Sequence, residues 1–213
     1  MIISHVTVAD LDGDLALLPE RYDPRRKIAT SGISLRRILE IKNKTIDPKT
    51  IDPSKACSLI ETSAAQNGII IGEKLVSSTE LHSSKRLLDP GDVLISRLRP
   101  YLRQVAFIDA DVFANRDYVL ASTEFYVLRP INPNENLAFL VPWLLSDEIQ
   151  NQLSLGQEGA HHPRFSPNTL LDLCVPEEIF NMRVKESSKV IDLSGKIRQA
   201  LRELGTFGLQ EPH

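Results

Sequence analysis

The 213-residue sequence lacks the short motifs that mark the common enzyme classes. It has no glycine-rich phosphate loop, no dinucleotide-binding glycine pattern, no nucleophile elbow and no His-Glu-x-x-His zinc site. The Asn/Asp-Pro-Pro-Tyr/Phe tetrapeptide of amino-methyltransferases is missing too. We therefore expect a protein that is not an enzyme and that binds no cofactor.

Cysteines and long apolar runs are also scarce. The two cysteines, Cys57 and Cys174, lie among apolar residues without metal-ligand spacing, as in reduced thiols of a cytoplasmic protein. No apolar run is long enough to span a bilayer. The first residues lack a basic start, and Asp10, Asp12 and Asp14 come early, which is unlike a signal peptide. These features predict a cytoplasmic protein with no membrane contact.

The chain as a whole has no excess of positive charge. Its net charge is −3, which argues against a globally basic surface for binding polyanions. Positive residues are nevertheless concentrated in one segment, in which Asp23 and Glu40 are the acids. That segment carries Arg21, Arg25, Arg26, Lys27, Arg36, Arg37, Lys42 and Lys44. A local basic patch is compatible with nucleic-acid binding, and equally with a chance surface composition.

The most informative segment is residues 89–103, with the sequence DPGDVLISRLRPYLR. A turn precedes the apolar run 93–95, which predicts a strand. Alternation along that strand would place Arg97, Arg99 and Tyr101 on one face. Two guanidiniums and a phenol on one face suit phosphates or base edges. A solvated strand face on an ordinary domain would show the same pattern.

The hydrophobic patterning predicts an α+β fold. Strands are expected at residues 2–8, 57–60, 68–72, 93–95, 104–108, 122–130 and 173–176. Helices are expected at 33–41, 137–155, 166–171 and 181–204, with Pro142 as a kink or first turn and Ser166 as a cap. We expect a mostly antiparallel globular domain over residues 1–176 and a projecting amphipathic helix with a tail over residues 177–213.

The last helix has apolar residues between lysines, arginines and glutamates. They are Val184, Ile191, Ile197, Leu201 and Leu204. A single amphipathic helix cannot bury such residues alone, so it must fold back on the domain or pair with another helix.

His161 and His162 are the one candidate for metal or acid–base chemistry. Neighbouring residues of an extended chain point to opposite faces, and no third ligand lies close in sequence. We therefore expect no metal site. A surface loop, or a contact to a phosphate or base, is the favoured interpretation.

The order of several short motifs resembles a known family. Residues 90–100 (PGDVLISRLRP) are followed by Ser122-Thr123-Glu124-Phe125, Leu128-Arg129-Pro130, Phe139-Leu140, Leu144-Leu145-Ser146, Gly156, Gly159, Pro163-Arg164-Phe165-Ser166, 170–173 and Val175-Pro176. This succession resembles the target recognition domain of the specificity subunit of type I restriction–modification systems. The terminal helix resembles the spacer helix that follows that domain. Typical members carry two such domains and two helices, and this chain has room for one of each.

The resemblance implies a subunit that reads double-stranded DNA. It would recruit an adenine methyltransferase subunit and, beyond that, a translocating restriction subunit. A half-length chain would imitate the full protein as a homodimer with antiparallel terminal helices and one half-site per domain. The residues expected at the DNA are Arg97, Arg99 and Arg103 centrally, Tyr101 as a stacking or structural residue, Arg164, His161 and His162 from a loop at the same end, and Lys85, Arg86 and Arg116 on phosphates.

Two other classes of function remain open from the sequence. The first is a protein–protein adaptor that docks a partner through its terminal helix, which the mild acidity favours; steep salt dependence of binding would argue for DNA instead. The second is a small enzyme that uses His161 or His162 with a carboxylate such as Glu158. It is the least favoured because the surrounding constellation is missing.

Overall fold

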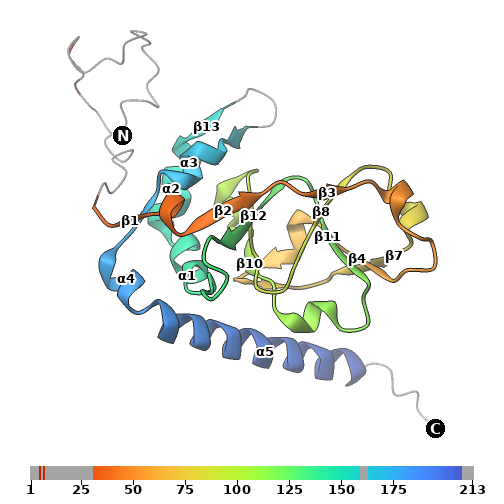
Figure 1. The fold of residues 1–213 in the computed structure, drawn as a ribbon. Helices are drawn as coiled ribbons and strands as arrows, with labels where there is room; N and C mark the ends of the chain where they lie inside the picture. Colours follow the sequence, from red (N-terminus) through yellow and green to blue (C-terminus); the bar gives the residue numbers. More distant parts are fainter. Residues whose placement is uncertain (1–4, 6, 8–30, 159–162, 208–213) are drawn as a thin grey trace.

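A computed structural model describes residues 5, 7, 31–158 and 163–207 of the chain. Most of the strand expected at residues 2–8, the first part of the basic segment, and both His161 and His162 lie outside these ranges. Within them the chain has a mixed architecture of antiparallel-rich sheets, short helices and one long helix (Figure 1). The expected α+β fold class is confirmed.

Two sheets form most of the body. Their strands are β2 (Leu39–Lys42), β3 (Thr45–Ile46), β4 (Cys57–Ile60), β7 (Lys74–Val76), β8 (Lys85–Leu87), β9 (Val93–Ser96), β10 (Val105–Phe107), β11 (Tyr118–Ala121) and β12 (Phe125–Pro130). The first sheet has the order β10-β9-β12-β2 and is antiparallel. The second has the order β3-β8-β11-β4-β7, and its β11–β4 pair is parallel. The turn 122–124 connects β11 to β12, so it links the two sheets.

Three short strand pairs complete the β-structure. They are β1 (Ile33–Ser34) with β15 (Cys174–Val175), β5 (Ala65–Gln66) with β6 (Ile69–Ile70), and β13 (Gln157–Glu158) with β14 (Arg164–Phe165). An isolated bridge joins Leu98 to Arg164, so the β13–β14 pair lies beside the chain as it leaves β9.

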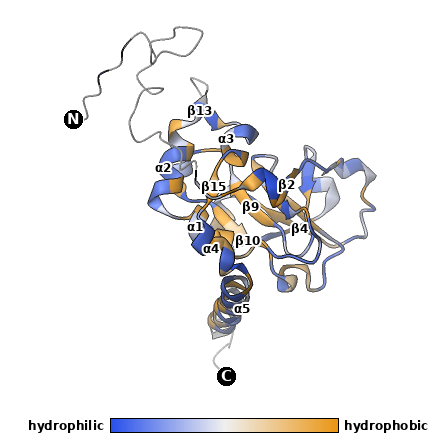
Figure 2. Ribbon diagram, turned by 60° about the vertical axis from the view of Figure 1, so that its left-hand side comes forward, coloured by the Kyte–Doolittle hydropathy of each residue, from blue (hydrophilic) through white to orange (hydrophobic). Residues whose placement is uncertain are grey.

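Strand β9 is buried throughout, and its first three residues are apolar, because both of its faces are covered. Val93 and Ile95 enter a core cluster with the short helices, whereas Leu94 enters a second cluster with Phe125 and Val127. This alternation is the period of two expected for a pleated strand. Buried strands of this kind are hydrophobic on both faces rather than on one. In Figure 2, β9, β10 and β15 accordingly fall in the hydrophobic interior.

The helices near this core are shorter than the sequence suggests. A single helix was expected over residues 137–155, but the chain forms α1 (Leu140–Leu144) and α2 (Asp147–Leu155). Ser146 separates them because its hydroxyl caps α2, accepting a hydrogen bond from the Ile149 N–H at 3.4 Å. The helix expected after Ser166 is confirmed as α3 (Pro167–Leu171), with the Ser166 hydroxyl accepting from the Thr169 N–H at 3.1 Å.

The helix expected at residues 33–41 is wrong. The segment instead contains β1, a short 3-10 turn (Leu35–Arg37) and β2. Leu39 and Ile41 pair with Pro130 and Leu128 of β12. Apolar spacing over so few residues fits a helix or a strand, and the available pairing with β12 decided between them.

The Pro-Gly-Asp turn before β9 is fixed by a buried ion pair. Gly91 has a φ of +91°, which glycine adopts without strain. The Asp92 carboxylate is 1% exposed and binds Arg129 through two contacts of 2.8 Å, from Nε and Nη2. It also accepts a hydrogen bond from the Asp89 N–H at 2.8 Å. Burial raises the pKa of Asp92, and Arg129 acts against that shift. The carboxylate therefore ties the turn to β12.

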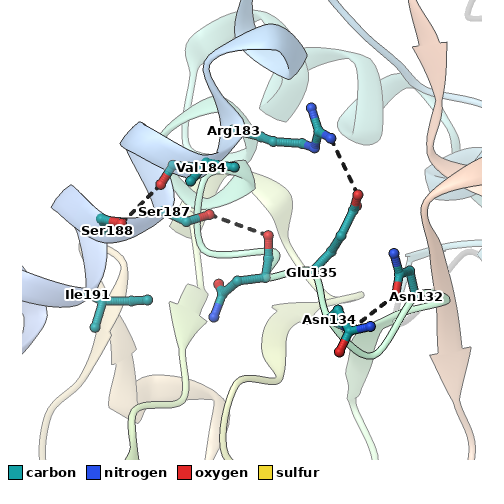
Figure 3. Close-up of a pocket in the computed structure, with 9 residues that line it drawn as sticks. Asn132, Asn134, Glu135, Arg183, Val184, Ser187, Ser188 and Ile191 are labelled. Carbon is teal, nitrogen blue, oxygen red and sulfur yellow. Dashed lines mark hydrogen bonds and ion pairs between the residues drawn. The ribbon is translucent and has the colours of Figure 1, made fainter.

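The long helix α5 (Arg183–Phe207) follows α4 (Glu177–Asn181) and runs along the body rather than projecting from it (Figure 1). Its first turns dock through polar contacts (Figure 3). The Ser187 hydroxyl accepts from the Phe139 N–H at 3.2 Å and donates to the Asn136 carbonyl at 3.3 Å. Arg183 pairs with Glu135 at 3.4 Å. None of the described helices is both long and apolar enough to cross a membrane.

Farther along α5, the buried residues are again polar. Ser194 and Arg198 are 2% and 9% exposed. The Arg198 guanidinium donates to the Ile70 carbonyl at 3.0 Å and to Glu73 at 2.8 Å, and its Nε lies 3.5 Å from an oxygen of Asp109. The five residues expected as an apolar stripe, Val184, Ile191, Ile197, Leu201 and Leu204, are all exposed. The helix thus docks mainly through polar residues, with Val190 packed against the core, and leaves these five apolar residues exposed in the single chain.

Candidate nucleic-acid interface

The arginine-bearing segment leaves the sheet earlier than expected. Strand β9 ends at Ser96, and Pro100–Leu102 forms a 3-10 turn. The expectation that Arg97, Arg99 and Tyr101 share one strand face is therefore wrong. Pro100 has no N–H for a sheet, and Arg99 takes a left-handed conformation that ends the extended chain.

This turn (residues 97–103) holds two arginines in an unfavourable backbone conformation. Arg99 has a φ of 46° and Arg103 a φ of 50°. The other two described non-glycine residues with positive φ are Asn67 and Asn115, a residue type that tolerates this region. Such a conformation costs an arginine on the order of 1 kcal/mol and persists where the surroundings impose it.

Helix α2 supplies part of that support. The Arg103 guanidinium donates to the Leu145 carbonyl at 3.4 Å and pairs with Asp147 at the start of α2. Arg103 is therefore engaged in holding the turn against the helix. Arg99 and Tyr101 are exposed, as Arg103 is, Tyr101 by 66%.

Three segments meet at Glu124, in the turn between β11 and β12. The Arg97 Nε donates to its carboxylate at 2.9 Å. Arg164, from β14, binds the same carboxylate through Nε at 2.9 Å and Nη2 at 2.8 Å. Backbone contacts reinforce the meeting point, because the Arg97 N–H donates to the Glu124 carbonyl and the Phe165 N–H to the Arg97 carbonyl. The structure thus brings two of the expected DNA contacts together on one acid.

A third arginine faces the same place. Arg86 lies on β8 opposite Ala121, the last residue of β11. Its Nε is buried and has no hydrogen-bond partner in the described part of the chain. Burial, and then the positive charge of Arg97, lower the pKa of Arg86. We refer to Arg86, Arg97, Glu124 and Arg164 as the Glu124 cluster; it has three guanidiniums for one carboxylate.

Tyr126 is a buried neighbour of the Glu124 cluster. Its hydroxyl donates to the Phe165 carbonyl at 2.8 Å, and the two rings meet edge to face at 5.6 Å. Burial raises the pKa of Tyr126, while the charges of Arg97 and Arg86 oppose that shift. The Tyr126 side chain is therefore held in place by Phe165, next to Arg97 and Arg86.

The two arginines hold the pKa of Glu124 at about 2, with the Arg164 hydrogen bonds as the largest cause. Because the folded-state pKa lies below the ordinary value of 4.5, the carboxylate stabilises the fold above about pH 4.5 and loses that contribution as the pH falls towards 2. We expect Glu124→Gln to cost about 2 kcal/mol of unfolding free energy at pH 6, allowing for solvent screening, and almost nothing near pH 2. Urea unfolding of both proteins at the two pH values measures the difference; an unchanged gap would contradict the assignment.

The remaining expected contacts are divided between the two ends of the second sheet. Lys85 precedes Arg86 on β8, so it lies at the same end of the sheet as the Glu124 cluster. Its amine donates to the Ser83 hydroxyl at 2.8 Å. Arg116 precedes β11 at its opposite end and donates to the Asn115 carbonyl. Arg116 is therefore separated from the cluster by the length of that strand.

Sequence reasoning did not single out the acid at the centre of this arrangement. Glu124 stands in the sequence as part of the Ser122–Phe125 motif, and no local pattern distinguishes Arg198 or Asp92 as structural residues. The available signal was that Glu124 is the one acid in residues 118–130. In the described ranges no group of three or more His, Cys, Asp or Glu residues could hold a metal ion.

The fold matches solved proteins of type I restriction–modification (R-M) systems. A chain from a structure of complex assembly and conformational transition of such a system aligns with a TM-score of 0.59 and 25% identity. The HsdS subunit from Thermoanaerobacter tengcongensis aligns with a TM-score of 0.56 and 26% identity. Each alignment covers 80% of this chain and 43% of the solved chain. No family model and no curated protein matches the sequence.

These neighbours are specificity subunits, so the resemblance inferred from the sequence is confirmed at the level of structure. The chain spans less than half the length of the solved chains that it matches.

Proposed function

We propose that this chain is a sequence-specific DNA-binding subunit of a type I R-M-like system, with no catalytic contribution of its own. The observation that carries the proposal is the Glu124 cluster, in which arginines from three distant segments converge in a fold shared with specificity subunits. Guanidiniums held in fixed planes suit both guanine edges and phosphates. Residues 1–176 would be the recognition domain and residues 177–213 the spacer helix and tail.

The partners follow from the same proposal. Duplex DNA would lie across the Glu124 cluster and the turn 97–103, with Lys85 on a phosphate and Arg116 farther along the backbone. An adenine methyltransferase subunit would dock on the chain, and a restriction subunit would join that complex in the cytoplasm. His161 and His162 remain proposed contacts, because they precede Arg164 in sequence.

We also propose that this chain reads one half-site and pairs with a second copy through α5 to read two. The exposed apolar residues of α5 divide into two groups about the buried line of Ser187, Ser194 and Arg198. At about 100° per residue, Val184 and Ile191 fall on one flank. The other flank carries Leu193, Ile197, Leu201 and Leu204, which are 46%, 42%, 38% and 70% exposed. The spacing of this second flank is that of a helix-pairing seam.

We therefore expect Ile197→Lys to abolish dimer formation and Val184→Lys, on the opposite flank, to leave it intact. A lysine in the centre of an apolar seam must be buried without a partner, whereas the same change on the other flank stays in solvent. Sedimentation equilibrium of the two variants and the wild type measures the oligomeric state. Dissociation by both changes, or by neither, would contradict a seam on the second flank.

The function is tested by selection from a random duplex library, using this chain mixed with the adenine methyltransferase encoded nearest to it. An enriched motif with two separated half-sites is the expected result. If the two proteins form a complex and nothing is enriched, DNA reading is excluded. The adaptor function would then be favoured by the uncovered apolar flank of α5.

A further inference from the structure

We propose that Glu124 is a positioning residue that sets sequence discrimination: it fixes Arg97 and Arg164 in one arrangement and keeps them from binding phosphates indiscriminately. This inference rests on the proposed DNA-reading function and assigns a role to the one acid of the Glu124 cluster. It predicts an unusual sign, because removing the acid should strengthen non-specific binding while weakening discrimination.

The geometry shows how one carboxylate can orient two base-reading side chains. A guanidinium carries five N–H donors in a rigid plane. Glu124 accepts one N–H of Arg97 and two of Arg164. Binding at Nε fixes the plane of the group. A fixed plane is what bidentate contact with a guanine edge requires, and each such pair discriminates against the wrong base.

The supporting contacts make this arrangement a preformed one. Arg97 follows β9, Arg164 lies on β14, and the Glu124 turn leads into β12. The Leu98–Arg164 bridge and the hydrogen bond from the Arg97 N–H to the Glu124 carbonyl hold these segments together without the side chains. Loss of the carboxylate would therefore free the guanidiniums more than it would displace the backbone.

The charge balance gives the second half of the proposal. With Glu124 the cluster carries three positive charges and one negative charge; without it, the three guanidiniums repel one another and attract any phosphate. Arg86 already experiences this repulsion, since Arg97 lowers its pKa in addition to the effect of burial. Phosphate contacts raise affinity for every sequence equally, so they reduce the fraction of binding energy that depends on sequence.

The test compares Glu124→Gln with wild type in the complex with the methyltransferase. Affinity is measured for the duplex enriched by the wild type and for a scrambled duplex, across a salt series. We expect the ratio of the two affinities to fall roughly tenfold or more, as when one bidentate contact is lost. We also expect binding to the scrambled duplex to strengthen at low salt and to depend more steeply on salt. A ratio taken on one preparation is unaffected by a partly unfolded fraction.

Two further variants separate position from charge. Glu40→Gln removes the same charge from β2, opposite Arg129 near the other end of β12, and should leave the ratio unchanged. Glu124→Asp keeps the charge but shortens the side chain by one methylene, and should lower the ratio without strengthening binding to the scrambled duplex.

A merely structural role predicts another result, in which both affinities fall together and their ratio holds. That outcome, or an unchanged ratio in Glu124→Gln, would overturn the inference alone, because the wild type would still discriminate. A wild-type complex that binds both duplexes equally would overturn the proposed function, and this inference with it.

Discussion

Replacing Arg198 with methionine is expected to lower the unfolding free energy by about 3 kcal/mol and to loosen α5 from the body. Arg198 is 9% exposed and joins three groups of the domain, the Ile70 carbonyl, Glu73 and Asp109. Methionine retains the apolar stem, so the loss isolates the guanidinium. The substitution leaves the Asp109 carboxylate buried without a compensating charge. Removing one partner of a buried ion pair is strongly destabilising for this reason.

The measurement is urea unfolding together with hydrogen exchange of the α5 amides. Arg202→Met is the matched control, because Arg202 lies one turn farther along and pairs with Asp111 at 2.9 Å between exposed side chains. It should cost less than about 1 kcal/mol. Equal losses of stability in the two variants would show that burial does not determine how strongly these arginines hold α5 to the domain.

The deficit of Arg198→Met should also depend on pH. Burial raises the pKa of Asp109, and Arg198 lowers it, so removing Arg198 raises that pKa further. An acid whose pKa is raised in the folded state destabilises the fold fully above that pKa, and the penalty shrinks as the pH falls towards the ordinary value of 3.8. The variant should therefore recover part of its stability as the pH falls, and adding Asp109→Asn should restore part of it at neutral pH. A pH-independent deficit would argue against Asp109 as the uncompensated group.

Replacing Asp92 with asparagine is the second change with a large expected effect, again about 3 kcal/mol. The asparagine side chain has nearly the size and shape of aspartate. Its amide nitrogen, however, would face the Nε or the Nη2 donor of Arg129 where the carboxylate offers an acceptor. Arg129, whose pKa is raised chiefly by its hydrogen bonds to Asp92, would keep only the exposed Asp89 as a charged partner. Thermal and urea unfolding measure the loss.

Asp89→Asn is the matched control for this change. Asp89 binds the same arginine at 2.6 Å from the same turn, but its side chain is 60% exposed, against 1% for Asp92. We expect a cost below about 1 kcal/mol, because an exposed ion pair gains little over hydration. A large loss of stability in Asp89→Asn with a small loss in Asp92→Asn would show that Asp89, and not Asp92, ties the turn to β12.

Several elements could be predicted from the sequence because their signals are local. In three segments the local residues alone predict the secondary structure. These are the β-branched and aromatic residues of β12, the apolar run of β9 and the Ser166-Pro167 start of α3. The order of short motifs was enough to indicate the specificity-subunit fold. The long terminal helix followed from its period and its lack of proline.

The tertiary structure decided what depends on distant partners. Glu124 meets Arg97 and Arg164 from 27 and 40 residues away, and no periodicity within one segment encodes that meeting. The segment 33–41 became strand because β12 offered a pairing edge. In α5 the buried face is set by the domain against which it packs, which presents hydrogen-bonding groups to Ser187 and Arg198. Ile197, Leu201 and Leu204 therefore stay exposed. Sequence patterns report which segments are amphipathic; the surface that a segment meets determines which face is buried, because unsatisfied polar groups cost more to bury than exposed apolar groups cost to leave in water.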